Sequence, residues 1–289
     1  MKALVTGAAG QVGRAWAAAA PDGWRLTALA RAELDIGDGE AVRRSVERLA
    51  PDLILSAAAY TAVDRAESEA EAAFRVNRDG AAHLARAAQA IGARLIHLST
   101  DFVFDGAAGR PYRPDDATGP LGVYGASKLA GEQAVLEALP EALIVRSAWI
   151  YGPEGSNFLA TMLRLMRSGG EVSVVADQIG APTSVLTLAP ALWSLAGTEA
   201  SGVWHFTNAG IASWYDFAQA IAEEALAVGL LTQAPDVRPI ATSDYPTPAR
   251  RPSYSVLDCQ ATYARLGAPA PHWREGLRAT LARMTRRAQ

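Results

Sequence analysis

The 289-residue sequence has little of the chemistry that crosslinks chains or binds metals. Cysteine occurs once, as Cys259, so no disulfide can form within the chain, which fits a reducing compartment. The histidines show no spacing with cysteine or acidic residues that is typical of a metal site, so we expect no catalytic metal. They are His83, His97, His205 and His272, and we expect His97 to be a core or hydrogen-bonded strand residue. The G-x-S-x-G pattern of a hydrolase nucleophile is also absent.

The sequence also lacks an excess of basic residues and any long apolar run. Its 27 lysines and arginines stand against 30 aspartates and glutamates, so we expect no nucleic-acid partner. Apolar stretches such as LAPALWSLAG are shorter than the ~20 residues that span a bilayer. The start, MKALVTGAAG, reads as a strand without signal-peptide features. We therefore expect a cytoplasmic protein without a membrane partner.

Half of the residues are apolar, and short apolar runs alternate with helical patterns along the first half of the chain. This alternation predicts βαβ units around a parallel sheet that is buried on both faces. The expected fold is a Rossmann-type doubly wound α/β sheet. Its strands are predicted at residues 2–6, 24–30, 52–59, 94–100 and 142–148, with helices from about residue 11, at 39–49, over 66–91 and from about residue 124.

After residue 151 the composition changes, because glycine and proline punctuate the sequence. Helices near 156–168, 185–196 and 213–228 are predicted to alternate with brief strands at 171–175 and 203–207. We interpret residues 1–151 as a dinucleotide-binding domain and residues 152–289 as a smaller α/β substrate-binding lobe. The segments are expected to interleave, so this boundary is not a sharp one.

The first strand is followed by a glycine loop, VTGAAGQVG. Gly7, Gly10 and Gly13 follow a strand and open a helix, which is the setting of a dinucleotide-binding turn. Such a turn needs residues that tolerate positive φ and a backbone that approaches a pyrophosphate closely. The amides of Gln11 and Val12, at the helix start, would then face the phosphates. The alternative is an ordinary turn.

The end of the second strand selects between NAD and NADP. Arg31 stands where an acidic residue would bind the ribose 2′-hydroxyl of NAD, and its guanidinium can hold a 2′-phosphate. We therefore favour NADPH, with NADH as an alternative coenzyme. The alternative for Arg31 is a solvated surface side chain. Further predicted coenzyme contacts are Asp35 and Ile36 near the adenine, and Ala57, Ala58 and Ala59 towards the nicotinamide.

A tyrosine and a lysine four positions apart suggest the chemistry. Tyr124 and Lys128 would share one helix face. The ammonium and a positive nicotinamide ring would lower the tyrosine pKa, so that Tyr124 could protonate a carbonyl oxygen. Leu98 and Thr100 end the fourth strand at the edge where open α/β sheets bind ligands, so Leu98 is a predicted coenzyme contact. The Thr100 hydroxyl is a third catalytic candidate that could bond the same carbonyl oxygen. In the plainer alternative, Lys128 only forms a surface pair with Glu132.

Together these segments resemble one family. TGAAGQVG, LSTDFVFDG and YGASKLAGE are similar to motifs of the extended short-chain dehydrogenase/reductase family. More narrowly, the chain resembles the dTDP-4-dehydrorhamnose reductases over nearly its whole length. The supporting segments are AAAYTAVDRAE, STDFVFDG, RSAWIYG, NFLATML, DQIGAPTS and RRPSYSVLD.

The resemblance implies a reaction and roles. Members of this family reduce the C4 ketone of dTDP-6-deoxy-L-lyxo-4-hexulose to dTDP-L-rhamnose with NAD(P)H. It implies that Tyr124 donates the proton, that Lys128 assists it, and that Thr100, Asp101 and Trp149 contact the sugar. A homodimer, and a structural metal at its interface, stay open.

Loops of the second half add further substrate-binding candidates. Arg251 is the best candidate for a diphosphate because its guanidinium can form paired hydrogen bonds. The plain alternative for all of these loop residues is turn chemistry or a solvated basic patch. The remaining candidates are Asn157, Gln178 and Thr183.

Three other readings remain. Nucleotide-sugar 4,6-dehydratases share the Tyr-Lys pair but need a further acid or base after Thr100-Asp101, where this chain has Phe102. The same position is often tyrosine in the reductases, and the phenylalanine loses only a hydroxyl. A 4-epimerase would use the same pair without net consumption of NADPH. A third reading is an NADP-binding regulatory subunit similar to that of methionine adenosyltransferase, which would not turn over a sugar.

Overall fold

A computed structural model describes residues 1–288 of the chain. Its centre is a six-stranded, wholly parallel sheet in the order β10-β5-β4-β3-β1-β2. The doubly wound α/β fold expected from the sequence is therefore confirmed. The strands are β1 (Lys2–Thr6), β2 (Arg25–Leu29), β3 (Leu53–Ser56), β4 (Arg94–Thr100), β5 (Leu143–Ser147) and β10 (Gly202–His205).

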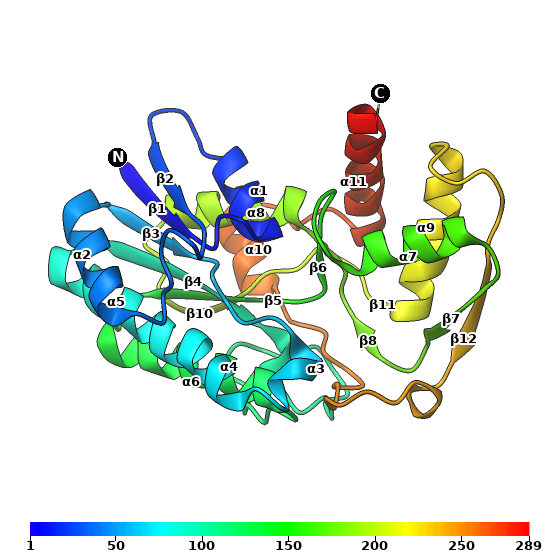
Figure 1. Cartoon of the computed structure of the whole chain (residues 1–289), viewed down its shortest axis with the longest axis horizontal. Coiled ribbons are helices and arrows are strands. Elements are labelled where there is room, and N and C mark those ends of the chain that lie inside the picture. The colour runs from blue at the N-terminus through cyan, green and yellow to red at the C-terminus, as the bar shows by residue number, and fades with distance from the viewer. Residues whose placement is uncertain (289) are drawn as a thin grey trace.

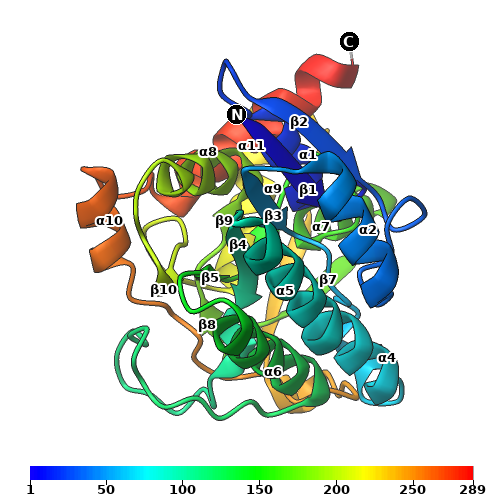
Figure 2. The same cartoon turned by 90° about the vertical axis from the view of Figure 1, so that its left-hand side faces the viewer.

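Helices cover both faces of this sheet (Figure 1). On one face lie α1 (Gln11–Ala18) and α8 (Val185–Ala196). On the other lie α2 (Gly39–Leu49), α5 (Ala81–Ile91) and α6 (Val123–Ala138). Figure 2 shows α1 and α8 above the strands and α5 and α6 below them. Because both faces are covered, the inner strands β1, β3 and β5 are buried along nearly their whole length.

Between β3 and α5 the chain forms α3 (Val63–Ala66), α4 (Ala70–Phe74) and the π-helical turn η1 (Arg75–Gly80), and β4 ends in the 3₁₀ turn η2 (Asp101–Val103). Asn77 of η1 is buried, and its side chain bonds to both backbone groups of Tyr60 and to Ser127 of α6. These bonds fasten the loop after β3 to α6. They thus hold the segment after β3 and the start of α6, both predicted to face the coenzyme, at a fixed separation.

A smaller lobe packs at one end of the sheet (Figure 1). Its core lies between three helices and the parallel pair β7–β12. The helices are α7 (Phe158–Ser168), α9 (Trp214–Ala227) and α11 (Trp273–Ala288), and the strands are β7 (Glu171–Val175) and β12 (Asp236–Ile240). The connecting elements are β6 (Ile150–Tyr151), β8 (Ile179–Gly180), β9 (Thr183–Ser184), β11 (Ala212–Ser213), η3 (Thr242–Asp244) and α10 (Gln260–Leu266).

Side-chain caps fix the starts of two helices in this lobe. Asn157 accepts a hydrogen bond from the amide of Ala160 at the start of α7. Ser213 and Asp216 form a reciprocal capping box at the start of α9. Each cap satisfies an amide that the helix itself cannot pair, so these residues determine where the helix begins.

One strand lies elsewhere than expected. The segment 203–207, assigned from the sequence to the smaller lobe, contributes to β10, which pairs with β5 at the edge of the central sheet. A strand's pattern shows that it is buried but not which sheet it joins. Residues on both sides of position 151 therefore build the central sheet, and the division of domains at that position stays a prediction.

No helix within residues 1–288 is long and apolar enough to cross a bilayer. The cytoplasmic location and the homodimer stay predictions.

Candidate active site

The tyrosine and lysine lie in the first two turns of α6, on the side that faces β4. Lys128 is 3% exposed, and its ammonium donates a 2.7 Å hydrogen bond to the carbonyl oxygen of Leu98. The surface pair with Glu132 that the sequence allowed is wrong. Glu132 is itself buried and accepts two hydrogen bonds, of 2.9 and 2.7 Å, from the guanidinium of Arg146 on β5.

The third predicted catalytic residue ends β4 close to the tyrosine. The Thr100 hydroxyl donates to Asp101 at 3.1 Å and accepts from the amide of Phe102 at 3.2 Å. Thr100 and Asp101 are both buried. The ring of Phe102 meets the ring of Tyr124 edge-on, with 5.6 Å between centroids. A hydroxyl, a phenol and a carboxylate thus meet at the carboxyl edge of the parallel sheet, where such sheets bind ligands.

Burial dominates the protonation of this cluster. It raises the pKa of Tyr124 to about 12; the Thr100 hydroxyl lowers that pKa and the nearby Asp101 carboxylate raises it. The expected lowering of the tyrosine pKa is therefore wrong for the chain by itself, because burial outweighs the influences that favour the phenolate. A pKa of about 12 keeps the phenol protonated at neutral pH, which is the form that a proton donor needs.

The other two charged groups shift in the direction that burial dictates. Burial lowers the pKa of Lys128 to about 8, against the opposing influence of the Glu132 carboxylate. Burial raises the pKa of Asp101 to about 6, although hydrogen bonds from Ser255 and Thr100 oppose the rise. Near neutral pH the lysine is mostly charged and the aspartate mostly ionised. Both groups nevertheless titrate within reach of physiological conditions.

The glycine loop has the geometry that a dinucleotide requires. Gly7 has φ +73°, and a Cβ there would lie 2.6 Å from the amide nitrogen of Ala58. A Cβ at Gly13 would overlap the Gly7 carbonyl oxygen. Gly10 is the N-cap of α1 and offers no side-chain cap, so the helix amides are left for another acceptor. The loop therefore fits the pyrophosphate of NAD or NADP.

The other predicted residues of this loop, Gln11 and Val12, already contact other parts of the protein through their side chains. The Val12 side chain packs in the core, so only its backbone can face a ligand. The Gln11 amide donates to the Ile150 carbonyl oxygen at 3.0 Å and accepts from Asn157 at 3.3 Å. Gln11 thus connects the glycine loop to the start of the smaller lobe.

At the end of β2, Arg31 is 76% exposed and lies 3.6 Å from the carboxylate of Asp35. Arg75 of η1 approaches the same carboxylate at 3.4 Å. The Gly37 amide and the two arginines lower the pKa of Asp35, although the largest single influence, burial, opposes them. Ile36 packs in the core. Both readings of Arg31, as a phosphate ligand and as a solvated side chain, remain compatible with this position.

The last predicted coenzyme contacts are Ala57, Ala58 and Ala59, which follow β3 and are half-buried. The close approach of Gly7 to the backbone of Ala58 places these alanines beside the glycine loop. Their small side chains leave the backbone at this strand end accessible.

On the predicted sugar side, Trp149 adopts an unusual backbone conformation. Its φ is +47°, in the left-handed region that only glycine enters freely. Its indole stacks on Trp214 of α9, with 3.5 Å between ring centroids and planes 4° apart. A Cβ on Gly180 would overlap the Trp149 ring. Contacts on both sides thus hold a strained tryptophan just beyond β5, which is typical of a functional position.

The remaining predicted substrate ligands bond to neighbouring protein groups. Gln178 donates to the Thr242 hydroxyl at 3.0 Å, and the fully buried Thr183 donates to a carbonyl of its own loop at 3.1 Å. Arg251 forms bonds of 3.0 and 2.8 Å to Asp64 of α3. Asn157 caps α7. These four residues hold loops together in this structure, and their contact with substrate stays a prediction.

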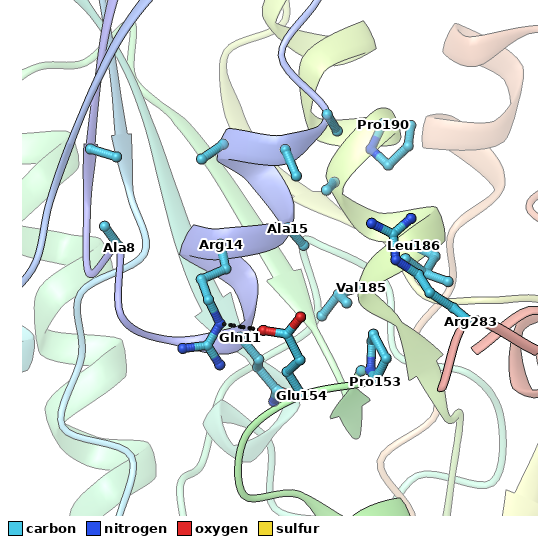
Figure 3. A pocket seen from close by; sticks show the side chains of 16 residues that line it. Ala8, Gln11, Arg14, Ala15, Pro153, Glu154, Val185, Leu186, Pro190 and Arg283 are labelled. Carbon is cyan, nitrogen blue, oxygen red and sulfur yellow. Dashed lines mark ion pairs between the residues drawn. The ribbon is translucent and has the colours of Figure 1, made fainter. Parts of the chain in front are cut away.

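A cavity of about 700 Å³ adjoins the glycine loop without including the catalytic candidates. Figure 3 shows it between α1, α8 and the loop that carries Glu154, with the Arg14–Glu154 ion pair of 3.3 Å at its centre. Ala8 and Gln11 belong to its lining, whereas Tyr124, Lys128 and Thr100 do not. It therefore extends from the predicted pyrophosphate position along α1, away from the reacting groups. Within residues 1–288, no three metal-binding side chains are clustered.

Comparison with known proteins identifies the family. A sequence model described as the RmlD substrate binding domain matches residues 1–286. The chain belongs to this RmlD family. A relative from Mycolicibacterium smegmatis, named dTDP-4-dehydrorhamnose reductase, is 47% identical over 284 residues, which cover 96% of this chain and 84% of the relative. A protein of the same name from Sinorhizobium fredii is 43% identical over 288 residues, 96% of either chain.

Solved structures agree with the RmlD assignment. The structure of dTDP-4-dehydrorhamnose reductase from Bacillus anthracis, in complex with NADP, superposes with a TM-score of 0.93 at 36% identity. It covers 98% of this chain and 99% of that one. The resemblance drawn from the sequence motifs is therefore confirmed at the level of the family.

Two side chains at this RmlD-family site are not among the residues expected there from the sequence, namely Trp214 and His97. Trp214 has no motif that links it to Trp149, because the two are brought together only by the start of α9. His97 is confirmed as a buried, hydrogen-bonded strand residue, but its Nε2 also lies 3.3 Å from the Lys128 ammonium. One feature of the sequence could have indicated this contact: His97 directly precedes Leu98, a predicted residue of the site.

Proposed function

We propose that this protein reduces the C4 ketone of dTDP-4-dehydrorhamnose to dTDP-L-rhamnose, in nucleotide-sugar biosynthesis. NADPH is the proposed coenzyme, and NADH is a second possible donor. The names of relatives at 43 and 47% identity support the substrate, and the NADP of the Bacillus anthracis structure supports the coenzyme. The observation that carries the proposal is the meeting of Tyr124, Thr100 and buried Lys128 at one strand end.

The proposed chemistry needs one hydride and one proton. Bound NADPH supplies the hydride to the C4 carbon. Tyr124 then gives its phenolic proton to the oxygen, which would otherwise carry a full negative charge. The Thr100 hydroxyl, beside the phenol, would hold the same oxygen by turning its proton from Asp101 towards the substrate. Lys128 binds the nicotinamide ribose with an ammonium proton and stabilises the phenolate that remains.

Binding of the substrate is assigned to the region facing the smaller lobe. Trp149, which is half-buried, is proposed to contact the sugar ring with the part of its indole that Trp214 and Gly180 leave uncovered. Asp101 can accept a hydrogen bond from a sugar hydroxyl. The guanidinium of Arg251 would have to exchange part of its contact with Asp64 for the diphosphate. Gln178, Thr183 and Asn157 are proposed to shape the surrounding loops.

The decisive experiment is incubation of the purified protein with the 4-keto sugar nucleotide and NADPH, with the product identified by NMR. Stoichiometric oxidation of NADPH and formation of dTDP-L-rhamnose are expected. Interconversion of two nucleotide sugars without loss of NADPH would instead identify an epimerase. No turnover, together with stable binding of NADP and a partner enzyme, would favour a regulatory subunit.

A further inference from the structure

His97 lies directly beneath the lysine of the candidate active site. It is 1% exposed and sits on β4, where the register of the sheet places it beside Ser56 of β3. Its two ring nitrogens have different neighbours. Nδ1 is 3.1 Å from the Ser56 hydroxyl oxygen, and Nε2 is 3.3 Å from the Lys128 ammonium nitrogen. Ser56, His97 and Lys128 thus form a continuous buried chain of polar contacts.

The donors in this chain determine the tautomer of the imidazole. A lysine ammonium can only donate, so the nitrogen facing it, Nε2, has to be the unprotonated acceptor. The ring proton then lies on Nδ1 and is donated to the Ser56 oxygen. Burial and the adjacent Lys128 charge lower the pKa of His97 well below its ordinary value, so the ring stays neutral. In this neutral form the ring can act as a hydrogen-bond acceptor, and it does not gain or lose a proton near pH 7.

We propose that His97 is a positioning residue for the reductase: its neutral Nε2 accepts a hydrogen bond from Lys128 and fixes the ammonium in place. The role in turnover rests on the proposed function, whereas the contact itself does not. Leu98 and His97 take up two of the three ammonium protons. The third is left for a ribose hydroxyl of the coenzyme. The ammonium is thereby aimed in one direction.

The same acceptor also maintains the charge of the lysine. A hydrogen bond to the charged form favours that form, so His97 raises the Lys128 pKa relative to a chain without this acceptor. The other charged and titratable groups around this lysine are Glu132 and Tyr124 on α6, Arg146 on β5 and Asp101 after β4. Glu132 also favours the charged lysine, but it is shared with Arg146, which binds it through two hydrogen bonds. Among these side chains, His97 is the one whose hydrogen-bond contact with the ammonium the structure shows.

The test uses an unusual feature of the composition. The chain has only two lysines, Lys2 and Lys128, so labelled lysine gives two NMR resonances. Lys2, at the exposed N-terminus, is the internal reference. The Lys128 pKa is read by titration in the full-length protein, in wild type, His97→Gln and His97→Asn. The Gln carboxamide oxygen reaches the position of Nε2 and can accept from Lys128, whereas Asn reproduces only the Nδ1 donor to Ser56.

The expected result separates positioning from packing. In His97→Asn the Lys128 pKa falls by about one unit or more, and the alkaline limb of the kcat–pH profile moves to lower pH. At fixed neutral pH, kcat falls roughly 10- to 100-fold, as for loss of a hydrogen bond to a charged group. In His97→Gln both the pKa and kcat return towards wild type. Melting temperature and circular dichroism establish that the variants are folded.

Two results would overturn the proposal. One is a Lys128 pKa that is the same in wild type, Gln and Asn variants, because His97 would then only fill space between α6 and β4. The other is a proton on Nε2 in the ¹⁵N spectrum of labelled histidine, because that nitrogen could not accept from the ammonium. A wild-type protein that lacks reductase activity would refute the proposed function, yet the lysine titration would still decide whether His97 holds Lys128.

Discussion

The two sides of the candidate site are held in different ways. On the side of the central sheet, Tyr124, Lys128 and Thr100 come from α6 and β4. The backbone at the end of β4 bonds to Lys128 and Thr100, and the Phe102 ring contacts Tyr124. On the side of the smaller lobe, Arg251 and Gln178 come from loops that bond to other segments, at Asp64 and Thr242. Reacting groups thus lie on rigid elements, and recognition groups lie where the chain can adjust.

This difference matches the demands on each side. A proton donor works only within hydrogen-bond distance of the oxygen it protonates, so the sheet and helix have to fix it before substrate arrives. Side chains that bind a diphosphate or a sugar can exchange one partner for another as the ligand binds. Substitutions on the first side should therefore change kcat most, and those on the second side should change KM most.

The largest effect is expected for Tyr124→Phe. This change keeps the ring and its contact with Phe102 but removes the only proton at that position. Because general acid catalysis contributes roughly 10²–10⁴-fold, kcat should fall by that factor while KM changes little. Steady-state oxidation of NADPH measures it, with Tyr215→Phe on α9 as the matched loss of a hydroxyl. A Tyr124→Phe enzyme with near wild-type kcat would remove the tyrosine from the mechanism.

The next prediction concerns stability and pH at Asp101. Its pKa is raised from the ordinary value of 3.8 to about 6, so the folded protein holds this proton more tightly than the unfolded chain does. Between these two values, stability falls as pH rises, because ionisation is disfavoured in the buried site. Each pKa unit is worth about 1.4 kcal/mol, so the total loss is about 3 kcal/mol.

The Asp101→Asn variant should not show this fall in stability with rising pH, because its side chain does not ionise. Urea unfolding of both proteins from pH 4 to pH 7 measures the difference, and the Asn variant should gain relative stability over that range by up to about 3 kcal/mol. A difference that stays constant with pH would show that the carboxyl group titrates normally and that the site is more polar than its burial implies.

On the recognition side, Trp214→Ala should loosen Trp149. The stacked pair contributes roughly 0.5–1.5 kcal/mol beyond buried area, so KM for the sugar nucleotide should rise roughly two- to tenfold with a smaller change in kcat. The coupled tryptophan signal in circular dichroism should disappear at the same time. Trp214→Phe retains a stacking ring and serves as the control. Equal losses of kcat in both variants would argue that the stack supports the fold rather than the substrate.

The smallest effect is expected at Arg31, the predicted ligand of the coenzyme's 2′-phosphate. Arg31→Ala should weaken NADPH roughly fivefold and leave NADH nearly unchanged, because a solvated guanidinium binds a phosphate only modestly. Titration of protein fluorescence with each coenzyme gives both affinities. Arg25→Ala, an exposed arginine at the opposite end of β2, is the control. Equal weakening of both coenzymes would favour the reading of Arg31 as an ordinary surface residue.

The regular parts of the fold could be predicted because they depend on local pattern. The strands at 2–6, 94–100 and 171–175 agree with the structure to the residue. The strand at 203–207, predicted for the smaller lobe, instead contributes to β10 in the central sheet. Its partner β5 is distant in sequence, and the local pattern carries no information about pairing. The helices α10 and α11 are not predicted from the sequence, since α10 spans only seven residues and arginine and alanine make up half of α11.

The sequence by itself determined the order of the elements, the glycine turn and the four-residue spacing that puts Tyr124 and Lys128 on one helix face, because each follows from backbone geometry over a few residues. Only the tertiary structure decided what surrounds them. Burial keeps the phenol protonated, His97 meets the ammonium from 31 positions away, and Arg251 meets Asp64 from 187 positions away. Solvation and long-range contacts depend on the whole packed chain, so no short segment specifies them.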